Sequence, residues 1–145
     1  LWLPGAGEAG REAYIADLEL EAALGGFADA LAFTAPTDAI ARAYAASDLV
    51  LQLSHKPEAF GRTVLEAMAV GRPVLGWNHG GVGELLARWQ PAGAVAPFDI
   101  DELHRKGHEL LTHPPSPAAT IPHSLRAMQE ATLAVYAELV DEPRR

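Results

Sequence analysis

The stretch PEAFGRTVLEAMAVGRPV, residues 57–74, decides how the surrounding sequence folds. Its glycines and prolines predict a loop, a helix and the start of a strand. Gly61 stands at the helix entrance, and Gly71, with a proline two residues later, is a typical helix stop signal. Between them, residues 63–70 are nearly all apolar and carry one charge, Glu66. A helix that is apolar on most faces is usually buried, and burying an unpaired carboxylate costs several kcal/mol. Glu66 therefore needs either solvent or hydroxyl and amide partners.

A second carboxylate precedes this helix. Glu58 lies eight positions before Glu66, on the loop and not on the same helix face. The first turn of a helix has backbone N–H groups without carbonyl partners, and the helix dipole favours negative charge there. Two carboxylates around such a helix end predict a site that binds hydroxyl groups while the helix N-terminus receives an anion.

Composition narrows the classes of protein to consider. A chain of 145 residues fits one domain, and 49% hydrophobic with 21% charged residues can form a real core. A net charge of −8 and a pI of about 5.1 argue against nucleic acid or an anionic membrane as the main partner. No cysteine occurs, which removes disulfides, thiolate catalysis and zinc–sulfur sites. Of the six histidines only His104 and His108 stand four residues apart, and one such pair is too few ligands for a zinc site, so we expect no metal. Because the first residue is Leu1 and not methionine, we expect a fragment of a longer protein.

Short apolar runs alternate with helical patterns along the chain. We expect strands at residues 1–3, 30–33, 49–53, 73–77 and 93–96, and helices at 11–24, 37–46, 63–70, 83–88, 101–111 and 124–140. This alternation predicts an α/β fold, a doubly wound parallel Rossmann-like sheet with helices on both faces. Thr37 or Asp38 is the expected cap of the second helix, and Asp101 that of the fifth. Ligands of such folds bind at the carboxyl ends of the strands, so we expect the site on the loops at residues 34–38, 54–61 and 78–83.

A glycine motif near the start offers a competing interpretation. Residues 5–10, GAGEAG, have the form G-x-G-x-x-G between a strand and a helix. A dinucleotide-binding unit also needs an acidic residue about 20 positions later for the ribose hydroxyls. The next expected strand ends in Thr34 and Ala35, which carry no carboxylate. The motif therefore favours a tight strand-to-helix turn over a dinucleotide-dependent oxidoreductase, which stays as the third hypothesis.

The opening stretch closely resembles the signature of the family-4 retaining glycosyltransferases, enzymes with the two-domain GT-B architecture. Their motif E-x(7)-E commonly lies within E-G-F-G-x-x-x-x-E-A-M-A-x-G-x-P-V, and residues 58–74 fill it with Ala59 in place of the commoner glycine. The resemblance covers most of the chain. It extends to residues 1–7 (L-x-x-x-G-x-G), 31–35, 44–48 (similar to Y-x-x-A-D, with Ser47 in place of the alanine), 80–84 (G-G-x-x-E, with glycine where proline is frequent) and the last helix, 125–140.

The resemblance implies the C-terminal domain of such an enzyme, which binds a UDP-, GDP- or ADP-sugar. By this analogy Glu66 accepts both ribose hydroxyls. Glu58, the catalytic candidate, binds the donor sugar's hydroxyls and supports positive charge that develops at the anomeric carbon. The backbone N–H groups of the helix entrance face the sugar and the diphosphate; these donor-binding residues are Phe60, Gly61, Arg62 and Thr63. No protein nucleophile, cofactor or metal is implied.

Six further residues are weaker candidates for the same site. The turn after Phe33 is expected to hold the base, which makes Thr34 a candidate. Loop residues near the two carboxylates could reach an anion, the donor or the acceptor; they are His55, Lys56, His79, Gly80 and Gly81.

Simpler interpretations stay open for several of these residues. Glu66 could be a solvated position on an ordinary helix, and Glu58 a surface charge. Arg62 is unfavourable to the helix dipole, so it fits either a nearby diphosphate or an ion pair with Glu58 or Glu66. We expect Phe60 to pack against the protein and Met68 to lie in the core.

Parts of the family's architecture have no match in this sequence. By the resemblance, we expect the chain to lack the family's first βα unit, which carries the arginine and lysine that neutralise the leaving group, and the N-terminal acceptor domain. We therefore expect the chain alone to be inactive, with a glycan or lipid-linked acceptor bound through the missing domain. The expected location is the cytoplasm or the cytoplasmic face of the membrane, in polysaccharide biosynthesis. A non-catalytic nucleotide-sugar-binding module is the second hypothesis.

Overall fold

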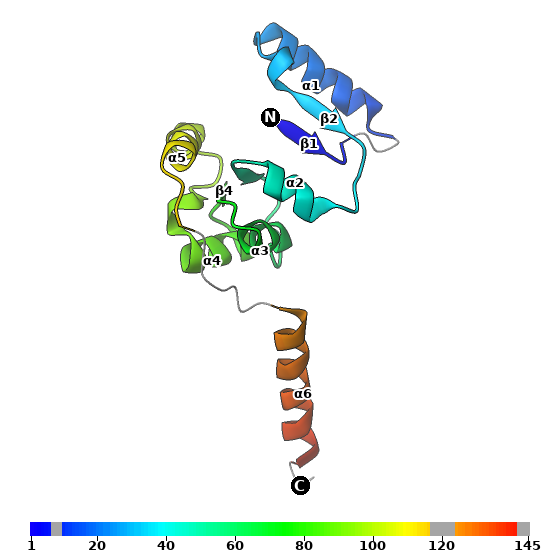
Figure 1. The fold of residues 1–145 in the computed structure, drawn as a ribbon, viewed down its shortest axis with the longest axis vertical. Coiled ribbons are helices and arrows are strands. Elements are labelled where there is room, and N and C mark those ends of the chain that lie inside the picture. The colour runs from blue at the N-terminus through cyan, green and yellow to red at the C-terminus, as the bar shows by residue number, and fades with distance from the viewer. Residues whose placement is uncertain (7–9, 117–123, 142–145) are drawn as a thin grey trace. The chain divides into compact units, whose positions relative to one another are not determined.

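The computed structural model describes residues 1–6, 10–116 and 124–141, and the chain divides into two compact units. The first unit is Leu1–Ala43 and the second is Tyr44–Arg145. Each unit is described by itself below, with the element labels of Figure 1.

The first unit is built on a pair of parallel strands. Strand β1 (Trp2–Pro4) pairs with β2 (Ala32–Thr34), and Leu3 lies opposite Phe33. Helix α1 (Glu12–Leu24) and the short 3₁₀ helix η1 (Ala28–Ala30) connect the two strands. The G-x-G-x-x-G motif of residues 5–10 falls partly on residues 7–9, which lie outside the described part of the chain.

The second unit holds a three-stranded parallel sheet in the order β3–β4–β5. Helix α2 (Ile40–Ala46) leads into it. The strands β3 (Val50–Gln52), β4 (Val74–Trp77) and β5 (Ala94–Val95) alternate with the helices α3 (Arg62–Ala69), α4 (Gly80–Trp89) and α5 (Ile100–Thr112), with the 3₁₀ helix η2 (Pro91–Gly93) before β5. In the pairing register, Val50 lies opposite Val74 and Trp77 opposite Val95.

Helices cover both faces of this sheet, because the side chains of the central strand β4 alternate between two hydrophobic clusters. Val74 belongs to a cluster completed by buried residues of β3, α3 and α4: Val50, Val64, Ala67, Met68, Val82 and Leu86. Leu75 and Trp77 belong to a second cluster with Val95 of β5 and Leu110 of α5. All four residues of β4 are buried. The predicted α/β class with helices on both faces is confirmed.

The end of α3 has the form that its sequence predicts. Gly71 has a φ of 76°, in the left-handed region that favours glycine. Its N–H donates to the carbonyl of Met68 at 2.9 Å, and the N–H of Arg72 donates to that of Ala67 at 3.0 Å. This pair of bonds is the Schellman arrangement that closes a helix at a glycine, and it turns the chain into β4.

Several predicted boundaries are wrong. The expected glycine-rich loop at 78–82 largely forms the first turn of α4, which begins at Gly80 and not at Gly83. Asp99, not Asp101, caps α5, because its Oδ1 accepts the N–H of Glu102 at 2.9 Å. The strand expected from residue 30 starts at Ala32, after η1, and the helix expected from residue 37 starts at Ile40.

The final helix, α6 (Leu125–Asp141), follows residues that lie outside the described part of the chain. The side-chain oxygen of Ser124 accepts the N–H of Ala127 at 3.1 Å, which caps the helix start. A helix over 124–140 was predicted, and the described bounds agree with it closely. No described helix is both long enough and apolar enough to cross a membrane.

Candidate functional site

The predicted site segment lies at the carboxyl edge of the β3–β4–β5 sheet, where the N-termini of α3 and α4 meet. The loop after β3 runs over the first turn of α4, and the N–H of Gly81 donates to the backbone carbonyl of Glu58 at 2.8 Å. A Cβ on Gly81 would lie 2.7 Å from the carbonyl oxygen of Ala59, and one on Gly80 would lie 2.6 Å from that of Glu58. Only glycine allows this approach. Gly80 and Gly81 thus position the loop that carries Glu58.

The side chain of Glu58 is held by two donors. Gln52, the last residue of β3, donates its Nε2 to Glu58 Oε2 at 2.5 Å. The N–H of Gly61 donates to Oε1 at 3.2 Å. Gly61 itself has a φ of 81° and forms the N-cap of α3, so the carboxylate sits against the helix N-terminus, where the dipole favours its charge. An oriented carboxylate of this kind can accept further hydrogen bonds from hydroxyl groups.

Glu66 lies one turn into α3 and has partners of its own. Its carboxylate forms an ion pair with Arg62, with Oε1 2.8 Å from Nη2 and 3.2 Å from Nε. The hydroxyl of Tyr44 donates to Oε2 at 3.4 Å. Of the interpretations left open for Arg62, the structure has the ion pair with Glu66. The Glu66 side chain keeps 35% of its surface exposed, so it is open to a ligand.

The phenol of Tyr44 lies in an unusual electrostatic environment. Its pKa is raised, first by burial and then by the negative charge of Glu66, against a hydrogen bond with Thr63 that lowers it. Burial and a neighbouring carboxylate both disfavour the phenolate. Tyr44 therefore stays a neutral donor, aimed at the carboxylate that is expected to bind the ribose.

Three rings gather where the strands of this unit end. His55 follows β3, His79 follows β4 and Phe98 follows β5. The Phe98 ring centroid lies 5.1 Å from that of His55 and 6.2 Å from that of His79. The Nε2 of His79 lies 3.2 Å from the carbonyl oxygen of Ser54, within hydrogen-bonding distance. Both histidines, predicted as weaker candidates, are thus at the expected edge.

The remaining candidates are placed less closely. Thr63 is half-buried in the first turn of α3, and Lys56 is exposed on the loop. Phe60 is 57% exposed, so the prediction that it packs against the protein is wrong, whereas Met68 lies in the core as predicted. Thr34 belongs to the first unit, where its Oγ1 accepts the indole N–H of Trp2 at 2.9 Å. It is not among the residues that the second unit assembles.

Sequence reasoning missed three residues of this region. Gln52, Tyr44 and Phe98 each contact a predicted site residue. Tyr44 begins the segment YAASD, whose resemblance to Y-x-x-A-D was a signal for the family but not for a contact with Glu66. Nothing in the sequence distinguishes Gln52 from an ordinary strand end or Phe98 from a surface aromatic residue.

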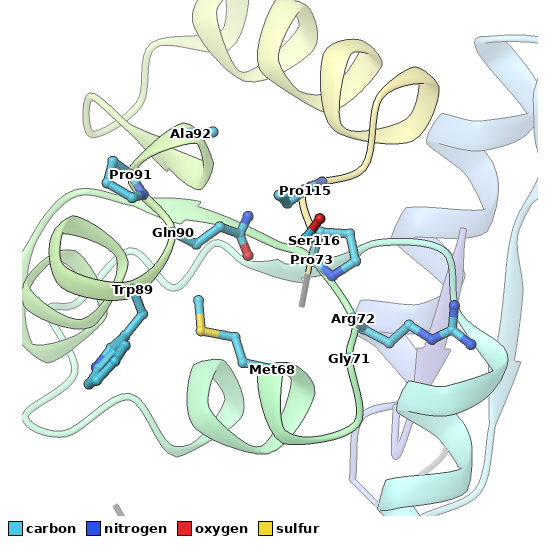
Figure 2. A pocket seen from close by; sticks show the side chains of 10 residues that line it. All are labelled: Met68, Gly71, Arg72, Pro73, Trp89, Gln90, Pro91, Ala92, Pro115 and Ser116. Atoms are coloured by element: carbon cyan, nitrogen blue, oxygen red, sulfur yellow. The ribbon is translucent and has the colours of Figure 1, made fainter. Parts of the chain in front are cut away.

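A cavity of about 180 Å³ lies at the opposite, amino-terminal edge of the sheet. Its lining comes from the ends of α3 and α4, the residues just before β4, η2 and the segment after α5, and includes Met68, Pro73 and Trp89 (Figure 2). The guanidinium of Arg72 points away from the other lining side chains (Figure 2) and donates to the carbonyl of Ala45 at 2.6 Å. The amide of Gln90 bonds both backbone groups of Val74. The described lining therefore directs no charge inward, which does not suit a nucleotide sugar.

No three histidine or acidic side chains gather as metal ligands in residues 1–6, 10–116 and 124–141. The expectation that the protein needs no metal stays a prediction.

Comparison with known proteins assigns the family. The model of the family described as "Glycosyl transferases group 1" matches residues 6–125. The chain belongs to this family. The 2-deoxystreptamine glucosyltransferase of Streptomyces kanamyceticus is 32% identical over 117 residues, which is 79% of the chain and 29% of that protein. The N-acetyl-alpha-D-glucosaminyl L-malate synthase of Bacillus anthracis is 45% identical over 58 residues, 40% of the chain and 15% of the relative. The chain thus spans less than a third of the length of these curated relatives.

Solved structures agree with the family match. HepE from Anabaena in complex with UDP-glucose is 29% identical with a TM-score of 0.66, over 75% of this chain and 30% of HepE. HepE in complex with UDP gives a TM-score of 0.72 at 23% identity, over 98% of this chain and 40% of HepE. At the level of family and fold, the expected GT-B glycosyltransferase domain is confirmed.

Proposed function

We propose that the chain supplies the donor-binding half of a retaining glycosyltransferase of family 4, which transfers a hexose from a nucleotide diphosphate to a glycan or lipid-linked acceptor. The observation that carries this proposal is the oriented carboxylate of Glu58 at the meeting point of two helix N-termini. Helix N-termini suit a diphosphate, and a fixed carboxylate suits sugar hydroxyls. The similarity to HepE, which was solved with UDP-glucose and with UDP, supports a UDP-sugar over a GDP- or ADP-sugar.

Each carboxylate has a distinct role in this proposal. Glu66 accepts the two ribose hydroxyls, beside the neutral phenol of Tyr44. To bind the ribose, Glu66 must release Arg62, its ion-pair partner, whose side chain is 77% exposed. Exposed ion pairs of this kind contribute only about 0–1 kcal/mol, so breaking this one costs little free energy. The released guanidinium can then bind the diphosphate. The N–H groups at the start of α3, from Phe60 to Thr63, approach the same anion.

Glu58 acts on the sugar itself. It binds donor hydroxyls and stabilises positive charge at the anomeric carbon as the bond to the diphosphate breaks. With no protein nucleophile assigned to the site, retention requires the acceptor hydroxyl to bond to the anomeric carbon on the same face from which the diphosphate leaves, with the hydroxyl proton passing to the leaving group. The other residues proposed to surround this carboxylate are His55, Lys56, His79, Gly80 and Gly81. Transfer would take place in the cytoplasm or at the cytoplasmic face of the membrane, without a metal or cofactor.

The test is calorimetric titration of the 145-residue protein with UDP, UDP-glucose, GDP-mannose, ADP-glucose and NAD⁺. We expect binding of a nucleotide sugar and none of NAD⁺. Glu66→Ala should weaken UDP binding by about 10- to 100-fold, the range for hydrogen bonds to a charged group. Glu58→Ala should weaken UDP-glucose binding and leave UDP binding nearly unchanged, because its partners are on the sugar.

The matched control is Glu109→Ala, which removes an exposed carboxylate from the outer surface of α5. Unchanged UDP affinity in Glu66→Ala would refute the ribose role, and binding of NAD⁺ in place of nucleotide sugars would favour the oxidoreductase hypothesis. We expect no sugar transfer by this chain alone, since no described residue is assigned to the acceptor. If a longer protein containing this chain binds UDP-glucose but transfers no sugar to any acceptor, the non-catalytic binding module is the better description.

A further inference from the structure

Phe98 adopts a backbone conformation that its side chain disfavours. Its φ is 67°, and no other non-glycine residue in the described part of the chain has a positive φ. The N–H of Asp99 donates to the carbonyl of Ala96 at 3.1 Å, so Phe98 is the third residue of a tight turn formed by residues 96–99. With proline second and a positive φ third, this is the pattern of a type II turn, in which glycine is the usual third residue. A bulky residue there is an outlier.

The turn is held in place by α5. The carboxylate of Asp99 caps the helix by accepting the N–H of Glu102 at 2.9 Å. Glu102 in turn accepts the N–H of Ala96 at 2.7 Å and pairs with Lys106 at 3.1 Å. Lys106 also donates to the carbonyl of Ala94 in β5. These bonds fix both ends of the turn, so the position of the Phe98 ring is set by the fold. Strained residues that are fixed in this way cluster at ligand sites.

The ring of Phe98 is half in contact with the protein and half open. Trp77, buried at the end of β4, has its ring centroid 5.7 Å from that of Phe98. His55 and His79 contact the same ring, yet Phe98 keeps 51% of its surface exposed. The result is an apolar face with two imidazoles beside it, fixed at the carboxyl edge of the sheet.

This cluster is tied to the loop that carries Glu58. His55 lies three residues before Glu58 on the same loop, and His79 forms the N-cap of α4, whose first turn bonds the Glu58 carbonyl. Glu66, by contrast, contacts Tyr44, in the helix that precedes β3. Tyr44 lies in the helix that leads into the edge strand β3, whereas Phe98 follows the other edge strand, β5.

We propose that Phe98, with His55 and His79, is a binding platform for the glycosyl ring of the donor. This rests on the proposed function, in which Glu66 binds the ribose and Glu58 the sugar. A pyranose presents an apolar C–H face and a rim of hydroxyl groups. The exposed aromatic ring matches the apolar face, and the imidazole nitrogens can donate to or accept from the hydroxyls. Because the platform adjoins the loop that carries Glu58, while Glu66 contacts Tyr44, we expect the platform to meet the sugar and not the nucleotide.

The test compares UDP with UDP-glucose on the 145-residue protein by calorimetry. Phe98→Ala should weaken UDP-glucose binding by about 3- to 10-fold, the range expected for one aromatic contact, and leave the affinity for UDP within twofold. Phe98→Tyr keeps the ring and should keep the affinity. Phe98→Gly removes the ring while suiting the turn, so it gives the same loss without a folding defect if the alanine variant is unstable. Ile100→Ala is the matched control, because it truncates a nearby apolar side chain that is 64% exposed.

Each outcome decides the proposal. Equal losses for UDP and UDP-glucose would place the ring at the nucleotide and overturn it, as would unchanged UDP-glucose binding in both Phe98→Ala and Phe98→Gly. In those cases binding of UDP by the unaltered protein still supports the proposed function. If the unaltered protein binds neither ligand, the proposed function fails, and the platform fails with it.

Discussion

The contact between the Glu58 loop and α4 makes a quantitative prediction for Gly81→Ala. The new Cβ would lie 2.7 Å from the carbonyl oxygen of Ala59 and 2.8 Å from backbone atoms of Phe60. These are backbone atoms, so relief requires the whole loop to move away from the helix. Overpacking of this kind costs about 1–3 kcal/mol, and alanine recovers up to about 1 kcal/mol as a better helix residue. The expected net loss of stability is about 1–2 kcal/mol.

Gly107→Ala is the same chemical change with the opposite expected sign. Gly107 lies inside α5, and its Cβ would meet the end of the Leu75 side chain at 3.3 Å. A flexible methyl group can yield by a few tenths of an ångström. Replacing a mid-helix glycine then stabilises the protein by about 0.5–1 kcal/mol.

Urea unfolding followed by tryptophan fluorescence measures both effects. A Trp2→Phe background leaves Trp77 and Trp89, which both lie in the second unit. With a slope near 2 kcal/mol per molar urea, Gly81→Ala should lower the midpoint by about 0.5–1 M, whereas Gly107→Ala should raise it. If Gly81→Ala leaves the midpoint unchanged, or if both variants shift it in the same direction, the close packing of the loop on α4 is not what stabilises this edge.

Two further predictions concern the supports of the sheet. Gln90→Ala removes the side-chain amide that accepts the N–H of Val74, at 3.0 Å, and donates to its carbonyl, at 2.9 Å. Each of these two buried groups is then unpaired, which should lower the free energy of unfolding by about 1–3 kcal/mol. An unchanged rate of hydrogen exchange at the Val74 amide would contradict this. Bonds from the N–H of Ala96 and from Lys106 lower the pKa of Glu102. The ionised carboxylate therefore stabilises the fold above its unfolded-state pKa, and this stability is lost as pH falls through the lower folded-state pKa. We therefore expect the urea midpoint of the Glu102→Gln variant to fall less between neutral pH and about pH 3 than that of the unaltered protein.

Local signals in the sequence were enough to predict the helix of the site and its end. The apolar run around Glu66 and the glycine after it specify α3 and its Schellman closure, because both depend on residues within one or two turns. The carboxylate spacing likewise placed Glu58 on the loop and Glu66 on the helix. These predictions required no knowledge of what lies across the fold.

The features that sequence reasoning missed depend on tertiary contacts. Glycines at 80 and 81 are typical of a loop, but here they begin a helix, because the backbone of residues 58–60 leaves no room for a side chain. The exposure of Phe60 and the turn at Phe98 are likewise set by packing and by α5. A propensity scale places glycine, not phenylalanine, in a left-handed turn, and this disagreement is what singles out Phe98.

The hydrogen bonds of Glu58 suggest why its position is fixed while that of Glu66 is adjustable. A carboxylate offers about four lone-pair sites, and Gln52 and Gly61 each use one on Glu58. The two that remain can receive hydroxyl groups while both positioning bonds persist. Glu66 is instead held by an exposed arginine and a long bond from Tyr44, which a ligand can replace. A group that must meet a short-lived charge benefits from rigidity, whereas a group that admits and releases a nucleotide benefits from exchangeable partners, so the two carboxylates are supported as their proposed roles require.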